Sequence, residues 1–431
     1  MKAPTIAVVG AGSSWFTPEL MRSLLSRPSL RGAAVRLTDV DGQRLAFMGR
    51  YGRWLHAGSD DTLDVSTWSD PADALEAADF VAVAVAIGGE RMRELDVQIP
   101  LRHGIVHVKG DTTGPAGIFR GLRGIPFMVN LAHQMERRCP GAVLLNVSNP
   151  LTVMTRAVLR ESRIRAAGFC SCIREMQGEF ARILGYPREH VDLQCIGVNH
   201  FTWMTGLYVD GREVPEEFIG KVVARFREGL PVTVDLYDAY GAFPVPGYKY
   251  ASEFFPWFLG AANEFGRKIG FAPDDAAARR ASADANRAQL VEDMTRPPSE
   301  LNRELSASTE EVVDFIEATH SGRPLIMNAN TPNLGRLSLA AASAVVEGPI
   351  LVAGRSRRPL LGGPLPSGVA RLLARVIEEQ ELVVEAAVKG SRDALLEAFL
   401  LDPLVTSLAA AKQLIEEMLD AERDFLPTFH A

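Results

Sequence analysis

A glycine-rich turn near the start of the chain has the residue types that a phosphate group requires. The turn follows the apolar run Thr5–Val9 and reads Gly10-Ala11-Gly12-Ser13-Ser14-Trp15. Gly10 permits a tight turn, and Gly12 lets the backbone approach a pyrophosphate closely. A helix that starts directly after them offers its first N–H groups and the positive end of its dipole to the same phosphates. The segment predicts a dinucleotide site, although Trp15 stands where the usual pattern has a third glycine.

An acidic residue follows the next predicted strand, Ala34–Thr38. This residue, Asp39, is placed to accept hydrogen bonds from an adenosine ribose, with Asp41 as the alternative if the strand ends later. A carboxylate at this point repels a 2′-phosphate, so it favours NAD over NADP. The competing interpretation is a glycine turn in an α/β protein that binds no nucleotide.

Alternating strands and helices are needed to hold such a turn, and the first half of the chain has that pattern. Continuous Val/Ala runs are typical of parallel strands that are buried on both faces. The expected strands are Thr5–Val9, Ala34–Thr38, Phe80–Ile87 and Ala142–Val147, and the expected helices are Pro18–Ser26, Gln43–Leu55, Asp73–Ala78 and Pro126–Arg138. This order predicts an α/β fold with a doubly wound parallel sheet.

The alternation fades beyond about residue 195. The stretch Tyr240–Gly247 is predicted as a loop, and Val369–Val388 and Leu404–Leu426 as long helices. We therefore expect two domains. Residues 1–195 form a dinucleotide-binding Rossmann domain, and residues 196–431 form a mixed α+β domain for substrate binding and subunit contacts.

Composition excludes several classes of protein. Hydrophobic residues make up 47% and charged residues 23% of the chain, and the net charge is -7, which argues against a nucleic-acid partner. No apolar run approaches the roughly 18 residues of a membrane span, and the run at Thr5–Val9 is too short for a secretion signal. The cysteines lack the spacing of a disulfide framework, so we expect reduced thiols and a cytoplasmic protein. The four are Cys139, Cys170, Cys172 and Cys195.

The turn at Gly10–Thr17 resembles the opening of glycoside hydrolase family 4, a family of NAD-dependent glycosidases with the fold of lactate and malate dehydrogenases. Further similarities run nearly the whole length of the chain, in the family's order and spacing. They are Gly88-Gly89, Gly110–Pro115, Asn149-Pro150, Gly168-Phe169-Cys170, Gly197–Trp203, Asn330–Gly335, Val346-Glu347, Pro364–Pro366 and Asp402-Pro403. The resemblance implies an oxidoreductive hydrolysis. NAD takes a hydride from C3 of the sugar, a base removes the C2 proton, the aglycone is eliminated, water adds, and the hydride returns.

The resemblance also assigns residues. Asp111 matches the acid toward the leaving group, a role that suits a carboxyl whose pKa is raised by burial. Asn149 matches a residue that holds sugar hydroxyls and lies beside the cofactor. Cys170 and His200 match the two protein ligands of a catalytic Mn²⁺. The plainer alternatives are turn-forming roles for Asp111 and Asn149.

The chain departs from the family's pattern at two places. Ser171 stands where the family commonly has a histidine after the cysteine, and Tyr248-Lys249-Tyr250 stands where some branches have Asp-Arg-His. These losses favour a site without metal, in which Cys170 is a small buried side chain and His200 polarises the substrate. Tyr248 is the first candidate for the base and Tyr250 the second. A tyrosine needs a nearby cation such as Lys249 for that role, and its alternative role is an aromatic wall.

The departures point to a sister group, the NAD-dependent sulfoquinovosidases, and hence to an anionic hexoside. The residues expected to bind the substrate are Asn149, Asn199, His200, Arg174, Lys249 and Arg91. A hexuronide is the next choice. The alternatives are a Mn²⁺-dependent α-glucosidase, α-galactosidase or α-galacturonidase, a net hydroxyacid dehydrogenase, and a nucleotide-binding regulator without turnover. The dehydrogenase requires an Asp-linked histidine, which the sequence does not show at the expected place. The resemblance implies a homo-oligomer.

Overall fold

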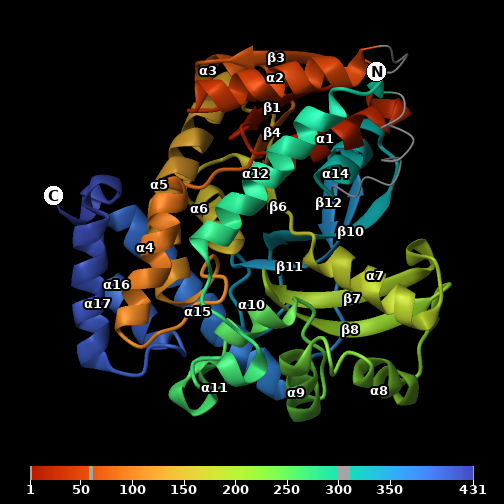
Figure 1. The fold of residues 1–431 in the computed structure, drawn as a ribbon. Coiled ribbons are helices and arrows are strands. Elements are labelled where there is room, and N and C mark those ends of the chain that lie inside the picture. The colour runs from red at the N-terminus through yellow and green to blue at the C-terminus, as the bar shows by residue number, and fades with distance from the viewer. Residues whose placement is uncertain (1, 58–61, 299–310, 431) are drawn as a thin grey trace.

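All strands in the described part of the chain belong to one sheet (Figure 1). The computed structural model describes residues 2–57, 62–298 and 311–430. The sheet has 12 strands in the order β3-β2-β1-β4-β5-β6-β10-β11-β7-β8-β9, with β12 paired to β11. The strands are β1 (Thr5–Val9), β2 (Ala34–Thr38), β3 (Asp64–Trp68), β4 (Phe80–Val83), β5 (Val143–Asn146), β6 (Arg165–Gly168), β7 (Val191–Val198), β8 (Phe201–Val209), β9 (Arg212–Glu213), β10 (Leu325–Pro332), β11 (Val345–Ala353) and β12 (Ser356–Pro359).

The first six strands are all parallel, and their order is that of a dinucleotide-binding doubly wound sheet. The fold class predicted from the sequence is therefore confirmed. β1 and β2 have the predicted bounds, whereas the predicted strand Phe80–Ile87 ends at Val83. The chain beyond Val83 is a loop at the carboxyl edge of the sheet, where ligands of such folds bind.

Helices cover both faces of the parallel strands, and further helices lie around the antiparallel strands (Figure 1). They are α1 (Phe16–Leu25), α2 (Gly42–His56), α3 (Pro71–Ala74), α4 (Gly89–Arg102), α5 (Gly114–Arg138), α6 (Leu151–Glu161), α7 (Cys172–Leu184), α8 (Glu216–Ala224), α9 (Pro231–Tyr240), α10 (Tyr248–Glu253), α11 (Pro256–Leu259), α12 (Ala276–Asp293), α14 (Glu311–Ser321), α15 (Ser367–Lys389), α16 (Arg392–Leu401) and α17 (Leu408–Ala421). None of the helices that the structure describes is both long and apolar enough to span a membrane.

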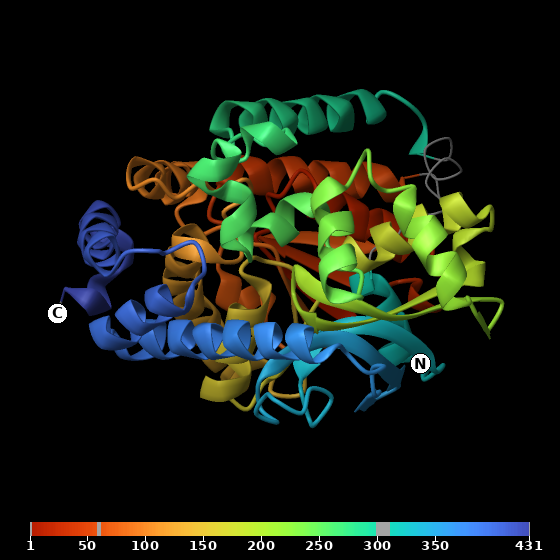
Figure 2. The ribbon, with the colours of Figure 1, turned by 90° about the horizontal axis from the view of Figure 1, so that it is seen from below.

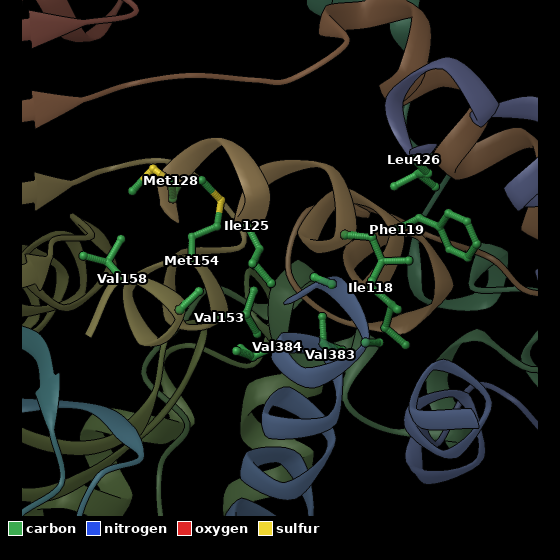
Figure 3. Packing of buried hydrophobic residues seen from close by; sticks show 14 of the residues in the cluster. Ile118, Phe119, Ile125, Met128, Val153, Met154, Val158, Val383, Val384 and Leu426 are labelled. Carbon is green, nitrogen blue, oxygen red and sulfur yellow. The ribbon is translucent and has the colours of Figure 1, made fainter. Parts of the chain in front are cut away.

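Alternate residues of each parallel strand enter two different cores. In β1, Ile6 and Val8 pack with the helices α1, α2 and α14, while Ala7 and Val9 pack with α5, α6 and α15–α17. Figure 3 shows the second of these cores, in which Ile118 and Phe119 of α5, Val153 of α6 and Val383 of α15 lie close together. Because both faces are buried, these strands are apolar throughout, which is why they could be predicted.

Helix α5 begins at Gly114, well before the predicted start at Pro126. A proline inside a helix removes one hydrogen bond and costs about 3 kcal/mol, so Pro126 looked like a helix start. The buried face of α5 extends on both sides of Pro126, from Ile118 to Met135, and this packing outweighs the loss. The early start matters because it places the N-terminus of α5 directly after residues 110–113.

The second half of the chain adds antiparallel strands to the same sheet. β10 pairs with β6, β11 with β10 and β7, and β8 with β7. Figure 2 shows α12 on one side of the strands and α15 on the other. The predicted division at residues 195 and 196 falls within β7, so the sheet continues across it.

A buried ion triad joins the nucleotide half to the end of the chain. The Arg123 guanidinium contacts Asp96 at 2.6 Å and also Glu422, and all three side chains are almost fully buried. Burial raises the pKa of Glu422, and the Asp96 carboxylate raises it further. Replacing Arg123 with methionine leaves two uncompensated buried carboxyls, so we expect a loss of about 3–5 kcal/mol in the free energy of unfolding near neutral pH.

The loss caused by Arg123→Met should depend on pH. A carboxyl whose pKa is raised in the folded state costs little stability below its unfolded pKa of about 4.3. The cost grows as the pH rises from that value toward the raised pKa of the folded state. Urea unfolding should therefore show a smaller difference between Arg123→Met and the wild type at about pH 5 than at neutral pH. Arg137→Met, on the last turn of the same helix, serves as the control, and an equal loss at both pH values would contradict this explanation.

Candidate active site

One buried carboxylate, that of Glu253, binds the backbone of the loop that carries Asp111. Oε1 of Glu253, at the end of α10, accepts the backbone N–H groups of Val108, Lys109 and Gly110 at 2.7, 2.8 and 3.1 Å. A carboxylate that binds three N–H groups fixes a loop more firmly than neutral hydrogen bonds do. The direction of the Asp111 side chain is therefore set by a residue from the second half of the chain.

The other end of the loop is fixed at the first turn of α5. Asp402 Oδ2 accepts the N–H of Gly114 at 2.8 Å and the hydroxyl of Thr113 at 3.2 Å. Gly114 has a φ of 69°, and a Cβ there would lie 2.2 Å from Cε1 of His107. Glycine is thus required at this position both for the backbone conformation and for space.

Asp111, Thr112 and His200 form a chain of hydrogen bonds. The Thr112 hydroxyl donates to Asp111 Oδ1 at 2.7 Å. The hydroxyl oxygen of Thr112 also lies 2.6 Å from His200 Nδ1. Because that hydroxyl proton goes to Asp111, Nδ1 of His200 carries the proton of the second bond and donates it to Thr112. The bond at Nδ1 fixes the orientation of the ring and leaves the other ring nitrogen, Nε2, available for a substrate or a metal ion. Catalytic and metal-binding histidines are commonly oriented in this way.

His200 is the centre of the cluster. It lies in the tight turn between β7 and β8 with a φ of 62°. Its Nε2 is 3.4 Å from Sγ of Cys170, and its ring stacks on Tyr250 with 3.8 Å between ring centroids. Asn149 reaches the same place from the end of β5, since its Nδ2 donates to Asp111 Oδ2 at 3.3 Å. The structure thus unites residues that the sequence places far apart.

The ionisable groups of Asp111 and His200 also lie close to each other. Nδ1 of His200 lies 3.8 Å from Asp111 Oδ1, so the Asp-linked histidine that the sequence did not reveal does exist, with Thr112 between the two groups. It was missed because its members come from two loops that only the complete sheet brings together.

Charged neighbours and burial shift the pKa values of Asp111, His200 and Cys170. Burial alone would raise the pKa of the Asp111 carboxyl, but His200 and Arg120 outweigh it and hold that pKa below its ordinary value. The condition set for the acid role, a pKa raised by burial, is therefore not met by Asp111 without bound substrate. Burial opposes a charge on His200, yet the Cys170 thiolate raises the pKa of His200 to about 9. Hydrogen bonding from Cys172 and the charge of His200 lower the pKa of Cys170.

A third possible metal ligand joins the predicted pair. Sγ of Cys170, Sγ of Cys172 and a ring nitrogen of His200 all lie within 4.8 Å of one another. These three donors fit a divalent metal ion, because thiolates and imidazole are the ligands that such ions take from proteins. Sequence reasoning missed Cys172, although the Cys-x-Cys spacing on either side of Ser171 was a usable signal.

The glycine-rich turn has the geometry of a nucleotide site. The N–H of Gly12 donates to Asp39 Oδ2 at 2.8 Å, so the turn and the end of β2 are joined. A Cβ on Gly10 would lie 2.2 Å from the carbonyl oxygen of Ala84, which explains the first glycine. Next to Asp39, the apolar side chain of Val40 is fully exposed, at 103%. An apolar side chain in this position suits the face of an adenine ring.

Three further residues of the predicted cofactor site lie at the start of α1. Ser13 Oγ accepts the N–H of Phe16, the first residue of the helix, at 3.0 Å, and Ser14 and the exposed Trp15 lie between them. The alternative ribose ligand, Asp41, is the N-cap of α2, where its Oδ1 accepts two backbone N–H groups. Asp39 also accepts two backbone N–H groups, from Gly12 at Oδ2 and from Asp41 at Oδ1, and of the two carboxylates it is the one joined to the glycine-rich turn.

The two candidate bases differ in position. Tyr248 opens α10, and its side chain lies outside the described part of the chain. Tyr250 is stacked against His200, and burial together with the Asp111 carboxylate raises the pKa of Tyr250 far above its ordinary value. A phenol whose pKa is raised gives a smaller fraction of phenolate near neutral pH, which weighs against Tyr250 as the base. The cation beside it is Lys109, whose Nζ lies 5.1 Å from the centre of the ring.

The cationic residues that were expected to bind the substrate lie on three different helices. Arg174, on α7, contacts Asp314 and lies 3.7 Å from Glu311, so two carboxylates balance its charge. Arg91 and Lys249 have exposed side chains on α4 and α10. Asn199 is buried and donates to Glu347 at 3.4 Å, behind His200.

The cations whose charges reach Asp111 are others that the sequence analysis did not select. Arg93 and Arg120 both lower the pKa of Asp111, and Arg120 also donates to the Asn149 carbonyl at 3.0 Å. Lys109 precedes Asp111 by two residues in the same anchored loop.

Comparison with known proteins agrees with this geometry. The Family 4 glycosyl hydrolase model matches residues 5–186, and the model of that family's C-terminal domain matches residues 195–405. The chain is 32% identical to an α-galacturonidase of Thermoanaerobacterium saccharolyticum, over 98% of this chain and 96% of the relative. Among solved structures, a candidate glucosidase from Bacillus subtilis has a TM-score of 0.88 at 28% identity, covering 97% of this chain and 100% of the other.

A 6-phospho-β-glucosidase from Thermotoga maritima, solved with manganese, NAD⁺ and glucose-6-phosphate, has a TM-score of 0.84 at 24% identity, covering 98% and 99% of the two chains. The two family models together span most of the described sheet, including the turn at Gly10–Gly12 and the loops of Asp111 and His200. The chain belongs to glycosyl hydrolase family 4 and is a glycosidase.

Proposed function

We propose that this glycosidase cleaves an anionic hexoside by transient oxidation at C3, with NAD as its resident cofactor. The observation that carries the proposal is the chain Asp111–Thr112–His200 beside Cys170, at the edge of the sheet that also holds the glycine turn and Asp39. A hydrolase that uses two carboxylates needs no dinucleotide turn, whereas an oxidoreductive glycosidase needs both sites at one edge.

The nucleotide end of this proposal rests on Asp39, Val40 and the turn at Gly10–Gly12. Bound NAD would accept the C3 hydride and later return it. Asp39 would bind the ribose hydroxyls, and the exposed Val40 would lie against the adenine. A carboxylate at Asp39 also repels a 2′-phosphate, which supports a preference for NAD over NADP.

Replacing Asp39 with alanine should weaken NAD binding by about 10- to 100-fold, since hydrogen bonds to a charged group contribute roughly 1.5–3 kcal/mol. The binding of NADP should weaken less, so the preference for NAD narrows. Isothermal titration calorimetry with both nucleotides checks this. Asp41→Ser keeps the helix cap and serves as the control, and an Asp39→Ala variant with unchanged affinity for NAD would rule out Asp39 as the ribose ligand.

The sugar end divides the proton transfers between two residues, one at the start of α10 and one in the loop before α5. We assign Tyr248 the removal of the C2 proton and Asp111 the transfer of a proton to the leaving oxygen. Since the lowered pKa of Asp111 leaves it ionised before binding, this acid role requires that the carboxylate first takes a proton from solvent. Tyr250 forms the wall on which His200 rests, and Asn149 holds a sugar hydroxyl. A divalent metal held by Cys170 and His200 would polarise the hydroxyl that is oxidised.

The charge around Asp111 supports an anionic substrate. Lys109 lies in the Asp111 loop itself, Arg93 of α4 and Arg120 of α5 carry charges that reach it, and Lys249 is adjacent on α10. Of these, Arg93 also contacts Asp274 at 3.3 Å. A carboxylate or sulfonate on C6 of the hexose would be bound by such cations. The 32% identical relative named an α-galacturonidase also has an acid at C6 in its substrate. We therefore propose a galacturonide or a sulfoquinovoside, with Lys109 as the first anion ligand.

The test uses two pairs of chromogenic glycosides whose members differ at C6, namely a sulfoquinovoside with a neutral glucoside and a galacturonide with a neutral galactoside. Dialysed enzyme is assayed with and without NAD. Cleavage of an acidic glycoside only when NAD is present supports the proposal, and the favoured arm identifies the anion. Cleavage of a neutral glycoside alone would overturn the anionic class. Accumulation of one NADH per substrate would instead indicate a net dehydrogenase, the second candidate that the Asp-linked His200 supports.

Lys109→Met should lower kcat/KM by about tenfold or more for the acidic glycoside, because it removes one charged hydrogen bond. The neutral glycoside should be affected little. Lys221→Met on α8 is the matched control, since it removes a lysine that lies over Phe218 instead of Tyr250. An equal loss for both glycosides would assign Lys109 a structural role.

A further inference from the structure

Two sulfur atoms, and not one, face His200. Cys170 and Cys172 flank Ser171 at the start of α7, and their Sγ atoms lie within 4.8 Å of each other and of the His200 ring nitrogen. Sγ of Cys170 is 3.4 Å from Nε2. A tetrahedral zinc ion bound by two thiolates and an imidazole would hold its ligand atoms about 3.5–3.8 Å apart, given Zn–S and Zn–N bonds near 2.3 and 2.0–2.1 Å. The cluster needs only small side-chain movements to reach that spacing.

We propose that Cys170, Cys172 and His200 form a Cys2His site that binds Zn²⁺ in preference to Mn²⁺, with Cys172 as the third protein ligand. Mn²⁺ favours carboxylate, carbonyl and water oxygens, whereas thiolates select zinc and other thiophilic ions. The Thermotoga maritima relative was solved with manganese, so this chain differs from it in metal. The difference rests on one residue that the resemblance to the family does not assign.

The surroundings of the three ligands are those of a metal site. Thr112 accepts from Nδ1 of His200, so the ring is held with Nε2 toward the two sulfurs, and Asp111 in turn accepts from Thr112. Such outer partners orient ligating histidines. Cys172 is the first residue of α7 and follows Cys170 by two positions, so both thiols lie at the N-terminal end of this helix. With a divalent ion bound, two thiolates and one neutral imidazole would balance its charge in a site where an unpaired charge is costly.

Three protein ligands leave the fourth position of a tetrahedral ion open. Structural zinc sites are closed by four protein ligands, whereas catalytic ones keep a place for water or substrate, and Cys2His is the ligand set that alcohol dehydrogenase uses to polarise an alcohol. The assignment of this open position to the sugar hydroxyl at C3 rests on the proposed function. The metal preference itself does not, because it depends only on the three donor atoms.

The test measures metal binding without turnover. Full-length protein is reduced, treated with EDTA, desalted and titrated with Co²⁺, whose thiolate charge-transfer band in the near ultraviolet reports sulfur ligands. We expect one Co²⁺ per chain with a tetrahedral visible spectrum, displaced by an equal concentration of Zn²⁺ but not of Mn²⁺. Cys172→Ser should lose about half of the charge-transfer intensity, because one of two thiolates is gone. Cys139→Ser, which removes a buried cysteine outside the cluster, should keep all of it.

Several results would overturn the proposal. Full band intensity in Cys172→Ser would mean that Cys172 is not a ligand, and displacement of Zn²⁺ by an equal concentration of Mn²⁺ would refute the preference. If freshly reduced, metal-free protein loses two free thiols by forming a disulfide between Cys170 and Cys172, the pair would have a redox role instead. If Cys172→Ser does not fold, the competition in wild-type protein still decides. Zinc binding without cleavage of any glycoside would overturn only the proposed function.

Discussion

A His200→Asn variant is expected to lose about 10²- to 10⁴-fold in kcat on the preferred glycoside, the range for removing a positioned group that moves or orients a proton. His200 contacts Thr112, Cys170 and Tyr250, so its loss disconnects Asp111 from the sulfur side of the site. Asparagine is chosen because His200 has a φ of 62°, a conformation that asparagine tolerates far better than alanine. The short amide cannot span from Thr112 to Cys170.

Initial rates at saturating NAD test this expectation, together with NAD affinity as a readout of folding. The matched control is His190→Asn, which changes an exposed histidine paired with Asp210 at the start of β7. The variant His200→Asn should bind NAD like the wild type, since the turn at Gly10–Gly12 and Asp39 are untouched. A kcat within a few-fold of the wild type would remove His200 from the mechanism.

The second large effect concerns Asp111→Asn, and its size should depend on the leaving group. If Asp111 transfers a proton to the departing oxygen, an alkyl glycoside that leaves poorly should lose about 10²- to 10⁴-fold in kcat. A nitrophenyl glycoside, which leaves without a proton, should lose far less. Asparagine keeps the volume and one acceptor for Thr112, so the contact to His200 is retained.

The measurement is a plot of log kcat against the pKa of the leaving phenol for wild type and Asp111→Asn. A steeper dependence in the variant supports the acid role. Equal losses across the series would show that Asp111 instead holds His200 and Asn149 in place, through the bonds at Thr112 and at Asn149 Nδ2. Thr112→Val, which cuts the same chain one residue later without removing the carboxyl, separates the two roles.

The parallel half of the fold could be predicted because its signals are local. Strand β1 is apolar on both faces, and the turn at Gly10–Gly12 follows it directly. The antiparallel half could not be predicted in the same way. β10 and β11 reach β6 and β7 across long stretches of sequence, and which strands pair is decided by packing rather than by local pattern.

The members of the site were largely predictable, but their relations were not. Asp111, Asn149, Cys170 and His200 were selected through the resemblance, and the structure places them in contact. The acid role of Asp111 was tied to a pKa raised by burial, and the sequence does not reveal that His200 and Arg120 lie beside this carboxyl and lower its pKa.

Cys172 and Lys109 escaped notice for a related reason. Each acquires its meaning from a neighbour distant in sequence, namely His200 for Cys172 and Tyr250 for Lys109. Arg174 shows the opposite case, since its positive charge suggested an anion ligand until the structure placed Asp314 and Glu311 beside it.

The central claim is that hydrolysis passes through removal and return of the C2 proton, and turnover in D2O tests it most directly. The sugar released from the preferred glycoside is analysed by NMR and mass spectrometry, with NAD present and no net change in NADH. The mechanism predicts one deuterium at C2 in the product, because the proton removed by the base is replaced from solvent, while C3 retains its original hydrogen. A product without deuterium at C2, formed at full rate, would contradict the mechanism and indicate direct displacement at C1.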